Sequence, residues 1–279
     1  MILNQIEEVY NFILVNINMK YNLVILIILL ILLFINLKKG KETFDNKNTI
    51  AFIIPTTSNK RDYKNILETD FFNILLGSIR KTHLDSNYNY IFYLGYDHDD
   101  KFFNSNDIQL KNEFKKLNLP NSNIQTVKIY NKKGKLGEIW SELAEIASKE
   151  CDYIYQLGDD IEILTSGWEE TFIRKLKENN NIGVVGPLDR NNKTILTQSF
   201  VHKTHLDIFG KYYPKEIKNW HIDDWITKVY ETNLSNKILS KQVRNSGGPP
   251  RYEVKRSNKE LKSCLRRDKK KLNDYLGSN

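Results

Sequence analysis

The chain has 279 residues, of which 40% are hydrophobic and 27% are charged. This is the composition of a folded protein with enough apolar residues for one large core or two small ones, and it excludes disorder throughout. Only two cysteines occur, Cys151 and Cys264. That count excludes a disulfide framework and a cysteine-rich metal site.

The formal net charge is +8, and most of it lies at the C-terminal end. Residues 251–279 carry ten Lys or Arg and four Asp or Glu, a surplus of six. No zinc-finger spacing and no RNA-binding aromatic motif accompanies these charges. We therefore predict a basic helical tail over 251–279 that faces solvent or a membrane surface, and no nucleic-acid partner.

A long apolar run lies near the N-terminus. Residues 23–35 are an unbroken series of Leu, Ile, Val and Phe, and the stretch 21–37 is close to the lower limit of about 17 residues needed to span a bilayer. We predict an N-terminal flank over 1–20, a transmembrane anchor over 21–37 and a linker over 38–48. A signal peptide is the alternative, although acidic residues precede the run and no small-residue cleavage site follows it.

Two opposing signals leave open the side of the membrane on which the rest of this single-pass protein lies. Lys38, Lys39, Lys41 and Lys47 follow the anchor, whereas only Lys20 and the amino terminus precede it, and the positive-inside tendency then favours a cytosolic domain. Two N-glycosylation triplets, at Asn192 and Asn233, favour a lumenal domain.

Beyond the linker, strand-like and helix-like patterns alternate. The predicted strands are 49–54, 90–94, 124–130, 153–157 and 182–185. The predicted helices are 62–80, 107–117, 135–148, 166–177 and one that begins at Trp220 or Asp223. Parallel strands need crossover helices, so this order predicts an α/β domain over 49–250 with a mostly parallel central sheet and helices on both faces.

Carboxylates follow the fourth predicted strand. Asp159, Asp160 and Glu162 stand beside Gly158, directly after the apolar run 153–157. Ligands of open α/β sheets bind outside the carboxyl ends of the strands, so these acids are placed to hold a divalent cation against a phosphorylated substrate. A solvated turn is the alternative, because Gly and Asp dominate turns for backbone reasons alone.

Asp223 and Asp224 form a second acidic station, between Trp220 and Trp225. At the start of a helix, either acid can serve simply as an N-terminal charge favoured by the helix dipole. Two acidic stations in one α/β domain also suit a division of labour. One would hold a cation that neutralises a leaving diphosphate, and the other would take a proton from an attacking hydroxyl.

The motifs, in this order, resemble those of the GT-A glycosyltransferases, especially the family 2-like group. The resemblance covers about residues 49–230. The first strand, with Pro55 and Thr56 at its end, resembles the opening strand of that family. Lys135-Leu136-Gly137 resembles the segment that leads into its metal strand. Similar enzymes with sequences rich in Asn, Ile and Lys occur in large DNA viruses.

The resemblance also implies roles for acidic residues. Asp97 stands where members of the family place a nucleobase-binding acid. Gly158-Asp159-Asp160 resembles the DxD metal motif, with Gly158 in place of the leading acid. Asp160 would then be the main ligand of Mn²⁺ or Mg²⁺, with Asp159 assisting.

On the acceptor side, the second of two adjacent acids is typically the base in this family. The resemblance therefore makes Asp224 the predicted general base, with Asp223 in reserve. Arg251, which follows two glycines and two prolines, suits a loop that closes over the diphosphate. An ordinary surface arginine beside a turn is the alternative.

Together these features predict a metal-dependent glycosyltransferase that moves a sugar from a nucleotide diphosphate-sugar donor to a glycan or protein acceptor. A base placed for direct attack predicts inversion. One alternative is a sugar-phosphate nucleotidylyltransferase, although such enzymes generally have a Gly-rich loop where this chain has Pro55-Thr56-Thr57-Ser58. The other is a non-catalytic, membrane-tethered binding module on a degenerate transferase fold.

Overall fold

The computed structural model describes residues 47–230, 233–253, 256 and 258–278. The predicted anchor over 21–37 lies outside these residues. No helix within the described ranges is both long enough and apolar enough to cross a membrane. The described residues from Lys47 onward belong to one compact unit.

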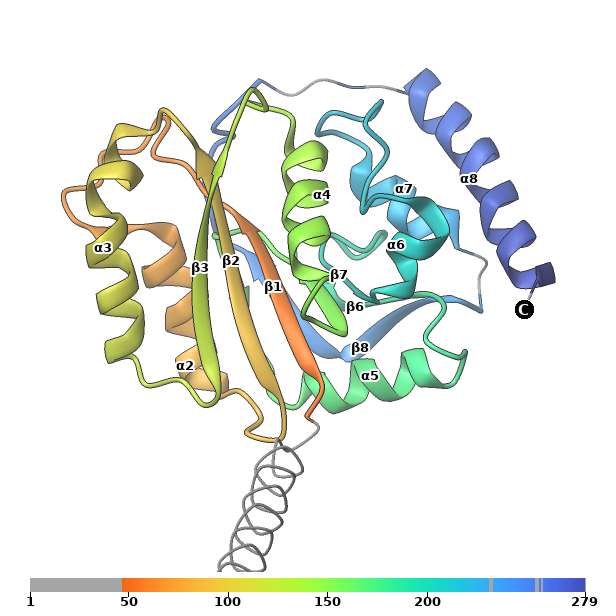
Figure 1. Ribbon diagram of the computed structural model, residues 1–279, viewed down its shortest axis with the longest axis horizontal. Coiled ribbons are helices and arrows are strands. Elements are labelled where there is room, and N and C mark those ends of the chain that lie inside the picture. Colours follow the sequence, from red (N-terminus) through yellow and green to blue (C-terminus); the bar gives the residue numbers. More distant parts are fainter. Residues whose placement is uncertain (1–46, 231–232, 254–255, 257, 279) are drawn as a thin grey trace, which may run out of the picture. The chain divides into compact units, whose positions relative to one another are not determined.

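The first half of this unit is a parallel α/β arrangement (Figure 1). Its four strands pair in parallel in the order β3-β2-β1-β4: β1 (Thr49–Pro55), β2 (Asn89–Asp97), β3 (Ser122–Ile129) and β4 (Tyr153–Gln156). The helical segments between them are η1 (Ile66–Glu68), η2 (Phe71–Leu76), α2 (Gly77–Thr82), α3 (Lys101–Lys116) and α4 (Leu136–Ala147). Crossover connections of this kind place the carboxyl ends of all four strands at one edge of the sheet.

The second half makes the sheet mixed, so the prediction of a mostly parallel sheet is wrong for this part. Its elements are β5 (Ile161–Ile163), α5 (Trp168–Lys177), β6 (Val184–Asp189), β7 (Ser199–His202), α6 (Thr204–Phe209), α7 (Ile222–Val229) and β8 (Ser235–Asn245). The full order is β3-β2-β1-β4-β7-β6-β8-β5, with β7 antiparallel to β4 and β6, and β5 antiparallel to β8. The loop from β6 to β7 carries no helix, so these neighbours run in opposite directions.

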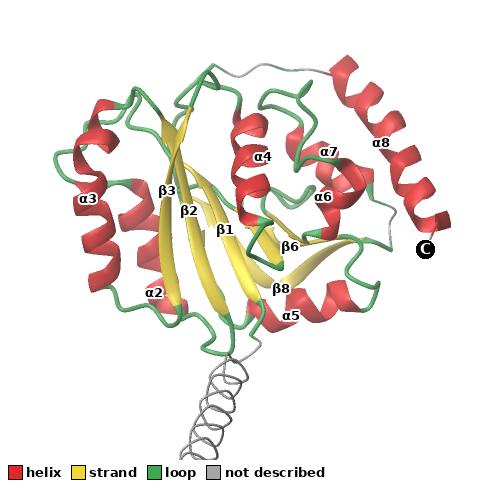
Figure 2. Cartoon of the chain, viewed as in Figure 1, coloured by secondary structure: helices red, strands yellow, loops and turns green. Residues whose placement is uncertain are grey.

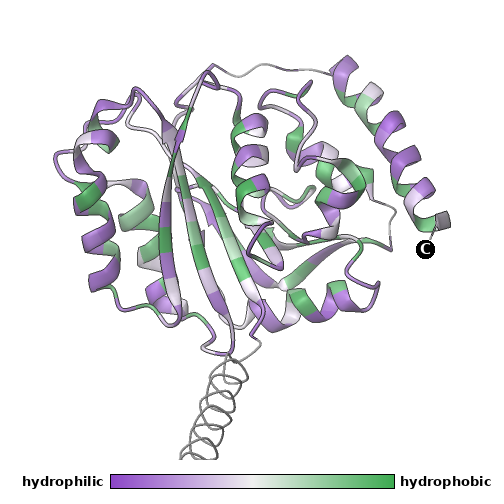
Figure 3. Ribbon diagram, viewed as in Figure 1, coloured by the Kyte–Doolittle hydropathy of each residue, from purple (hydrophilic) through white to green (hydrophobic). Residues whose placement is uncertain are grey.

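Helices cover both faces of the sheet (Figure 2). Along β1, Phe52 and Ile54 belong to the core beneath α3 and α5, whereas Ala51 and Ile53 belong to the core beneath α4. A strand buried on both faces reads as a continuous apolar run, which is why β1 was predictable. The green stretches along β1 in Figure 3 show this apolar centre.

The basic tail contains a helix that packs on the domain. Three side chains of α8 (Asn258–Ser278) are buried in the core beneath α4: Leu261, Cys264 and Leu272. Asp268 is buried as well and accepts a hydrogen bond from Trp225 Nε1 at 3.2 Å. One side of the helix therefore completes the core, and its lysines and arginines line the other.

The predicted helix over 62–80 is built from η1, η2 and α2 in succession, of which η2 is a π-helix. The Thr69 hydroxyl donates to the Ile66 carbonyl at 2.7 Å where η1 ends. The helix predicted over 107–117 begins earlier, at Lys101, because Asp100 caps it by accepting from Phe103 N at 3.1 Å.

Candidate active site

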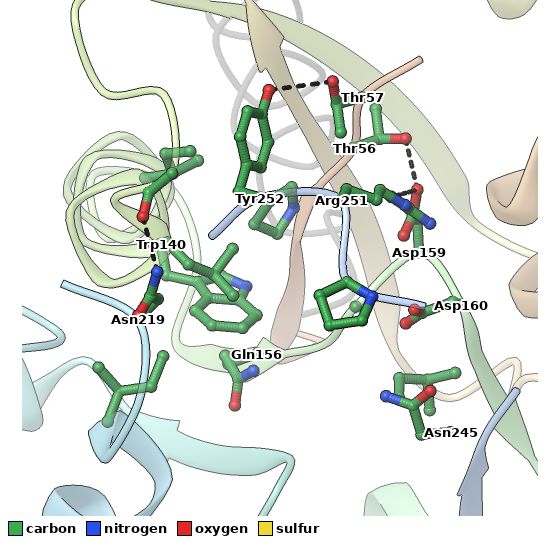
Figure 4. Close-up of a pocket in the computed structure, with 18 of the residues that line it drawn as sticks. Thr56, Thr57, Trp140, Gln156, Asp159, Asp160, Asn219, Asn245, Arg251 and Tyr252 are labelled. Atoms are coloured by element: carbon green, nitrogen blue, oxygen red, sulfur yellow. Dashed lines mark hydrogen bonds and ion pairs between the residues drawn. The ribbon is translucent and has the colours of Figure 1, made fainter. Parts of the chain in front are cut away.

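A cleft of about 420 Å³ opens at the carboxyl ends of β1, β2 and β4. It is lined from the first half of the domain by side chains that follow these strands, and from the second half by residues of β6, β8 and the start of α7. The acids that line it are Asp97, Asp159, Asp160, Asp189 and Asp223. Carboxylates from separate parts of the chain thus face one hollow, of which Figure 4 shows Asp159 and Asp160.

Asp97 lies at one end of the cleft, where β2 ends. It is 5% exposed and accepts a hydrogen bond from the Tyr252 hydroxyl at 2.5 Å. The Tyr252 and Thr57 hydroxyl oxygens are 3.2 Å apart, as drawn in Figure 4. Burial raises the pKa of Asp97, and the Tyr252 hydrogen bond works against that rise.

The loop after β1 is held by Asp100. This carboxylate accepts hydrogen bonds at 2.8 Å from both the Ser58 backbone N–H and the Ser58 hydroxyl, and a third at 3.3 Å from the Thr57 hydroxyl. Because the same carboxylate caps α3, the loop and the helix are fixed together. Thr56 and Thr57 are thereby presented to the cleft on a rigid turn.

Asp159 is the centre of a buried charged cluster. Its Oδ2 accepts a hydrogen bond from the Thr56 hydroxyl at 2.5 Å and from Arg251 Nη1 at 2.7 Å. The other terminal nitrogen of Arg251 contacts Asp70 at 2.5 Å, and Arg61 also pairs with Asp70 at 3.3 Å. The predicted loop arginine is therefore no ordinary surface residue.

Asp160 has no ion-pair partner among the described residues. Burial, and then the negative charge of Asp159, raise the pKa of Asp160 to about 6, although Arg251 acts in the opposite direction. A Cβ on Gly158 would lie 2.6 Å from Asp160 Oδ1, and one on Gly247 would lie 1.8 Å from its Oδ2. The two glycines leave the space that this carboxylate fills, which accounts for glycine at the position of the leading acid.

The charges around Asp160 fit a divalent cation, although no group of three or more His, Cys, Asp or Glu in the described ranges could hold one alone. Asp70, Asp159 and Asp160 outnumber the guanidinium groups of Arg61 and Arg251 by one negative charge. A diphosphate would add further negative charge. A cation bound by Asp160, diphosphate oxygens and water would balance it, as Mg²⁺ commonly keeps several waters.

A segment after β8, residues 246–253, lies across the cleft, and we call it the strap. The Ser246 N–H donates to the Asp160 carbonyl at 3.0 Å, and Arg61 Nη2 donates to the Gly247 carbonyl at 2.6 Å. Farther along, Asn59 Nδ2 donates to the Arg251 carbonyl at 2.6 Å. These contacts, with the Arg251 ion pairs, fix the strap against the loop after β1.

The second acidic station places its two acids differently. Asp223 lines the cleft, whereas Asp224 does not. Asp224 pairs with Lys228 at 2.6 Å and with His221 at 3.1 Å. Burial alone would raise the pKa of Asp224, but the hydrogen bonds from Lys228 and His221 lower it below its usual range.

Asp223 is half-buried, and its carboxylate makes no hydrogen bond or ion pair with the described residues. Burial, followed by the negative charges of Asp224 and Asp189, raises the pKa of Asp223 to about 8. A carboxyl group that faces the cleft and titrates near neutral pH has the properties of a general base. At this station the geometry favours Asp223.

The remaining predicted residues divide between the cleft and its surroundings. Pro55 and Thr56 line it. Lys135 and Gly137 do not: Lys135 Nζ lies 3.8 Å from Glu138, and the Gly137 N–H donates to a backbone carbonyl at 3.0 Å. A Cβ on Gly137 would lie 3.0 Å from the Ile217 carbonyl oxygen, so this glycine serves close packing.

Sequence reasoning missed, among others, two residues that line the cleft, Gln156 and Tyr252, and Asp70, which pairs with Arg251 beside it. Asp70, the second partner of Arg251, lies within a predicted helix with no motif around it. Tyr252 falls beyond the predicted domain, and its only signal was its position next to Arg251. Gln156 is the one polar residue in an apolar strand, a signal that could have been read.

No protein family model matches the chain, and no curated protein matches it in sequence. Among solved structures, GalNAc-T7 in complex with UDP, GalNAc and Mn²⁺ superposes with a TM-score of 0.50 at 11% identity, over 72% of this chain and 44% of that one. This chain has the GT-A fold of glycosyltransferases.

Two further GT-A structures match less well. S. aureus TarS 1–349 in complex with UDP has a TM-score of 0.48 at 14% identity, over 79% of this chain and 65% of that one. Another TarS structure has a TM-score of 0.49 at 13% identity, over 73% and 37%. The chain thus spans between 37% and 65% of the length of these three structures. The superposition with GalNAc-T7 supports the predicted GT-A fold.

Proposed function

We propose that this protein is a metal-dependent, inverting glycosyltransferase that transfers a sugar from a nucleotide diphosphate-sugar to an acceptor hydroxyl. The observation that carries the proposal is the convergence of Asp97, Asp160, Asp223 and Arg251 on one cleft. They come from four separate parts of the chain. A GT-A structure that contains UDP, GalNAc and Mn²⁺ supports a uridine diphosphate donor.

The donor would lie along the edge formed by β2, β1 and β4. Asp97, with Thr57 and Tyr252 beside it, offers hydrogen-bonding groups to the nucleoside. Arg251 would reach the diphosphate, because a guanidinium fork matches phosphate oxygens. Asp160 would hold the divalent cation, which supplies positive charge to the leaving diphosphate.

The acceptor would enter on the side of α7. In this proposal Asp223, in its ionised form, takes the proton from the acceptor hydroxyl as the oxygen attacks the anomeric carbon, and the diphosphate leaves from the opposite side. A single displacement of this kind inverts the anomeric centre. Asp223 replaces Asp224 as the proposed base, because Lys228 and His221 occupy the Asp224 carboxylate.

The test is a donor screen with the full chain, Mn²⁺ and common UDP- and GDP-sugars, read as nucleotide release with and without simple sugar acceptors. D223N should lower kcat by about 10²- to 10⁴-fold, the usual contribution of a general base. D224N, the matched control one residue away, should change kcat less than tenfold. Full activity in folded D223N would sink the base assignment, and binding without turnover of any donor would favour a non-catalytic module.

The site of action and the acceptor extend the proposal beyond the described residues. Anchoring through residues 21–37 would hold the domain beside a membrane, where glycan or protein acceptors are presented. The observation behind this part is the apolar run alone. Release of the full chain from membranes by high salt or carbonate would argue against an anchor.

A further inference from the structure

Gln156 is a buried amide at the floor of the cleft. It is the last residue of β4, is 1% exposed and lines the hollow. Its neighbours along the strand are apolar or aromatic. Burying a polar side chain is unfavourable unless it is hydrogen-bonded, so the hydrogen-bond partners of this amide must be identified.

One half of the amide is fully engaged. Gln156 Oε1 accepts hydrogen bonds from the Ser199 backbone N–H at 3.1 Å, the Ser199 hydroxyl at 3.0 Å and the Tyr213 hydroxyl at 3.2 Å. A backbone N–H can only donate, so the atom that faces Ser199 must be the oxygen. The orientation of the amide is therefore fixed, and Nε2 is on the other side.

Nε2 is left as a donor. Within the described ranges it has no hydrogen-bond partner, although Gln156 lines the cleft. Figure 4 shows the Gln156 side chain among the residues that line the cleft. An amide group held by three bonds on its oxygen and open on its nitrogen is preorganised to donate to a ligand.

The place of Nε2 indicates which part of the ligand it meets. Gln156 is four residues before Asp160 on the same strand end. Gln156, Asp160 and Asp223 all line the same cleft. The amide therefore shares one hollow with the proposed cation ligand and the proposed base. In a displacement, the sugar ring occupies the space between the leaving diphosphate and the attacking oxygen.

We propose that Gln156 Nε2 donates a hydrogen bond to a ring hydroxyl of the transferred sugar and so determines which sugar the enzyme accepts. This inference rests on the proposed function. It assigns Gln156 to the sugar and not to the nucleotide or the acceptor, because a buried group on the floor is reached by the ligand that binds deepest. A sugar without that hydroxyl would leave the amide unpaired and bind more weakly.

The test compares binding to the full chain of UDP, UDP-glucose, UDP-galactose, UDP-N-acetylglucosamine and GDP-mannose, followed by monodeoxy analogues of the tightest binder. Q156M and Q156E both remove the Nε2 donor at nearly constant volume. We expect each to weaken the sugar nucleotide roughly tenfold and to leave the free nucleotide within about twofold. Q125M, which alters a glutamine on β3 that bonds Glu150, is the matched control.

The deoxy series locates the partner hydroxyl. One deoxy analogue should bind the wild type roughly tenfold more weakly than its parent, and Q156M should lose that preference. Equal weakening of nucleotide and sugar nucleotide by both variants, or unchanged sugar-nucleotide binding, would overturn the role of Gln156 and leave the transferase proposal standing. No binding of any sugar nucleotide to the wild type would overturn both.

Discussion

Arg251 Nη1 and Asp159 Oδ2 lie 2.7 Å apart, although the two residues are 92 positions apart in the chain. The arginine side chain is 12% exposed and the aspartate side chain 3%. The same guanidinium bridges to Asp70. The strap is thus joined to the end of β4 and to the start of η2 by one charged group.

Removing this arginine should destabilise the domain. R251A would leave Asp159 and part of Asp70 as uncompensated buried charges, which typically costs about 3–5 kcal/mol. R244A is the control, because Arg244 pairs with Glu162 at a more exposed position and should cost about 1 kcal/mol or less. Chemical denaturation of both variants checks this, and equal stabilities would contradict it. R251A should also weaken UDP binding.

Replacing Asp223 should stabilise the protein at alkaline pH. Its pKa is raised in the folded state to about 8, so folding favours the protonated form, and the resulting stability is present below the ordinary aspartate pKa and lost as pH rises through about 8. D223N carries no titrating group. Its melting temperature should exceed that of the wild type by roughly 2–4 °C at pH 8, with the gap closing toward pH 4. If the difference in melting temperature between D223N and the wild type widened at acidic pH, the raised pKa of Asp223 would be refuted.

The same pKa should set the pH dependence of the proposed reaction. The free enzyme holds Asp223 protonated at low pH, so kcat/KM should rise as pH approaches about 8 and level off above it. D224N should keep this limb, because the pKa of Asp224 is lowered and its carboxylate is already ionised near neutral pH. Measuring kcat/KM from pH 5 to 9 for the wild type and D224N tests this expectation. A flat wild-type profile would exclude Asp223 as the base.

A side chain at Gly247 should displace Asp160. The Cβ would lie 1.8 Å from the carboxylate oxygen Oδ2, far inside van der Waals contact. We expect G247A to lower metal-dependent UDP binding as strongly as D160N does. G277A is a matched control in α8, where an added Cβ meets no atom within 4 Å. Wild-type affinity in G247A would show that the strap does not lie against Asp160 in solution.

Chelation should weaken nucleotide binding through Asp160. With EDTA, the wild type should bind UDP at least tenfold more weakly than with Mn²⁺, because the diphosphate then meets a site with net negative charge. D160N should bind UDP weakly in both conditions. If chelation leaves the wild type unchanged and UDP binding stays tight, the site does not use a cation. Calorimetric titration of UDP measures all four cases.

The parts of the site that could be predicted from sequence are those fixed by local order along the chain. Asp97, Asp159 and Asp160 follow apolar strands, and parallel strands bring their ends together whatever the details of packing. Asp223 and Asp224 could not be told apart, because one residue of rotation on a helix decides which faces the cleft and which meets Lys228.

Other features depend on contacts between distant segments, and no local pattern encodes them. β8 mixes polar and apolar residues and is partly exposed along its length, so it shows no clear strand period. The pairing of Arg251 with Asp70 requires the strap to pack against the loop after β1 and the start of η2. Lys135 and Gly137 match a family motif in sequence, but here α4 uses them for an ion pair and for close packing.

The strap continues from β8, which is paired within the sheet, and its far end is held by Asn219 Nδ2, which donates to the Glu253 carbonyl at 2.9 Å. Because both ends of the strap are attached, its middle can move outward but the strap cannot open as a hinged lid. A ligand that binds beneath it would therefore need this outward movement to enter and to leave. In the proposed enzyme, release of the spent nucleotide would then be coupled to the outward movement of the strap.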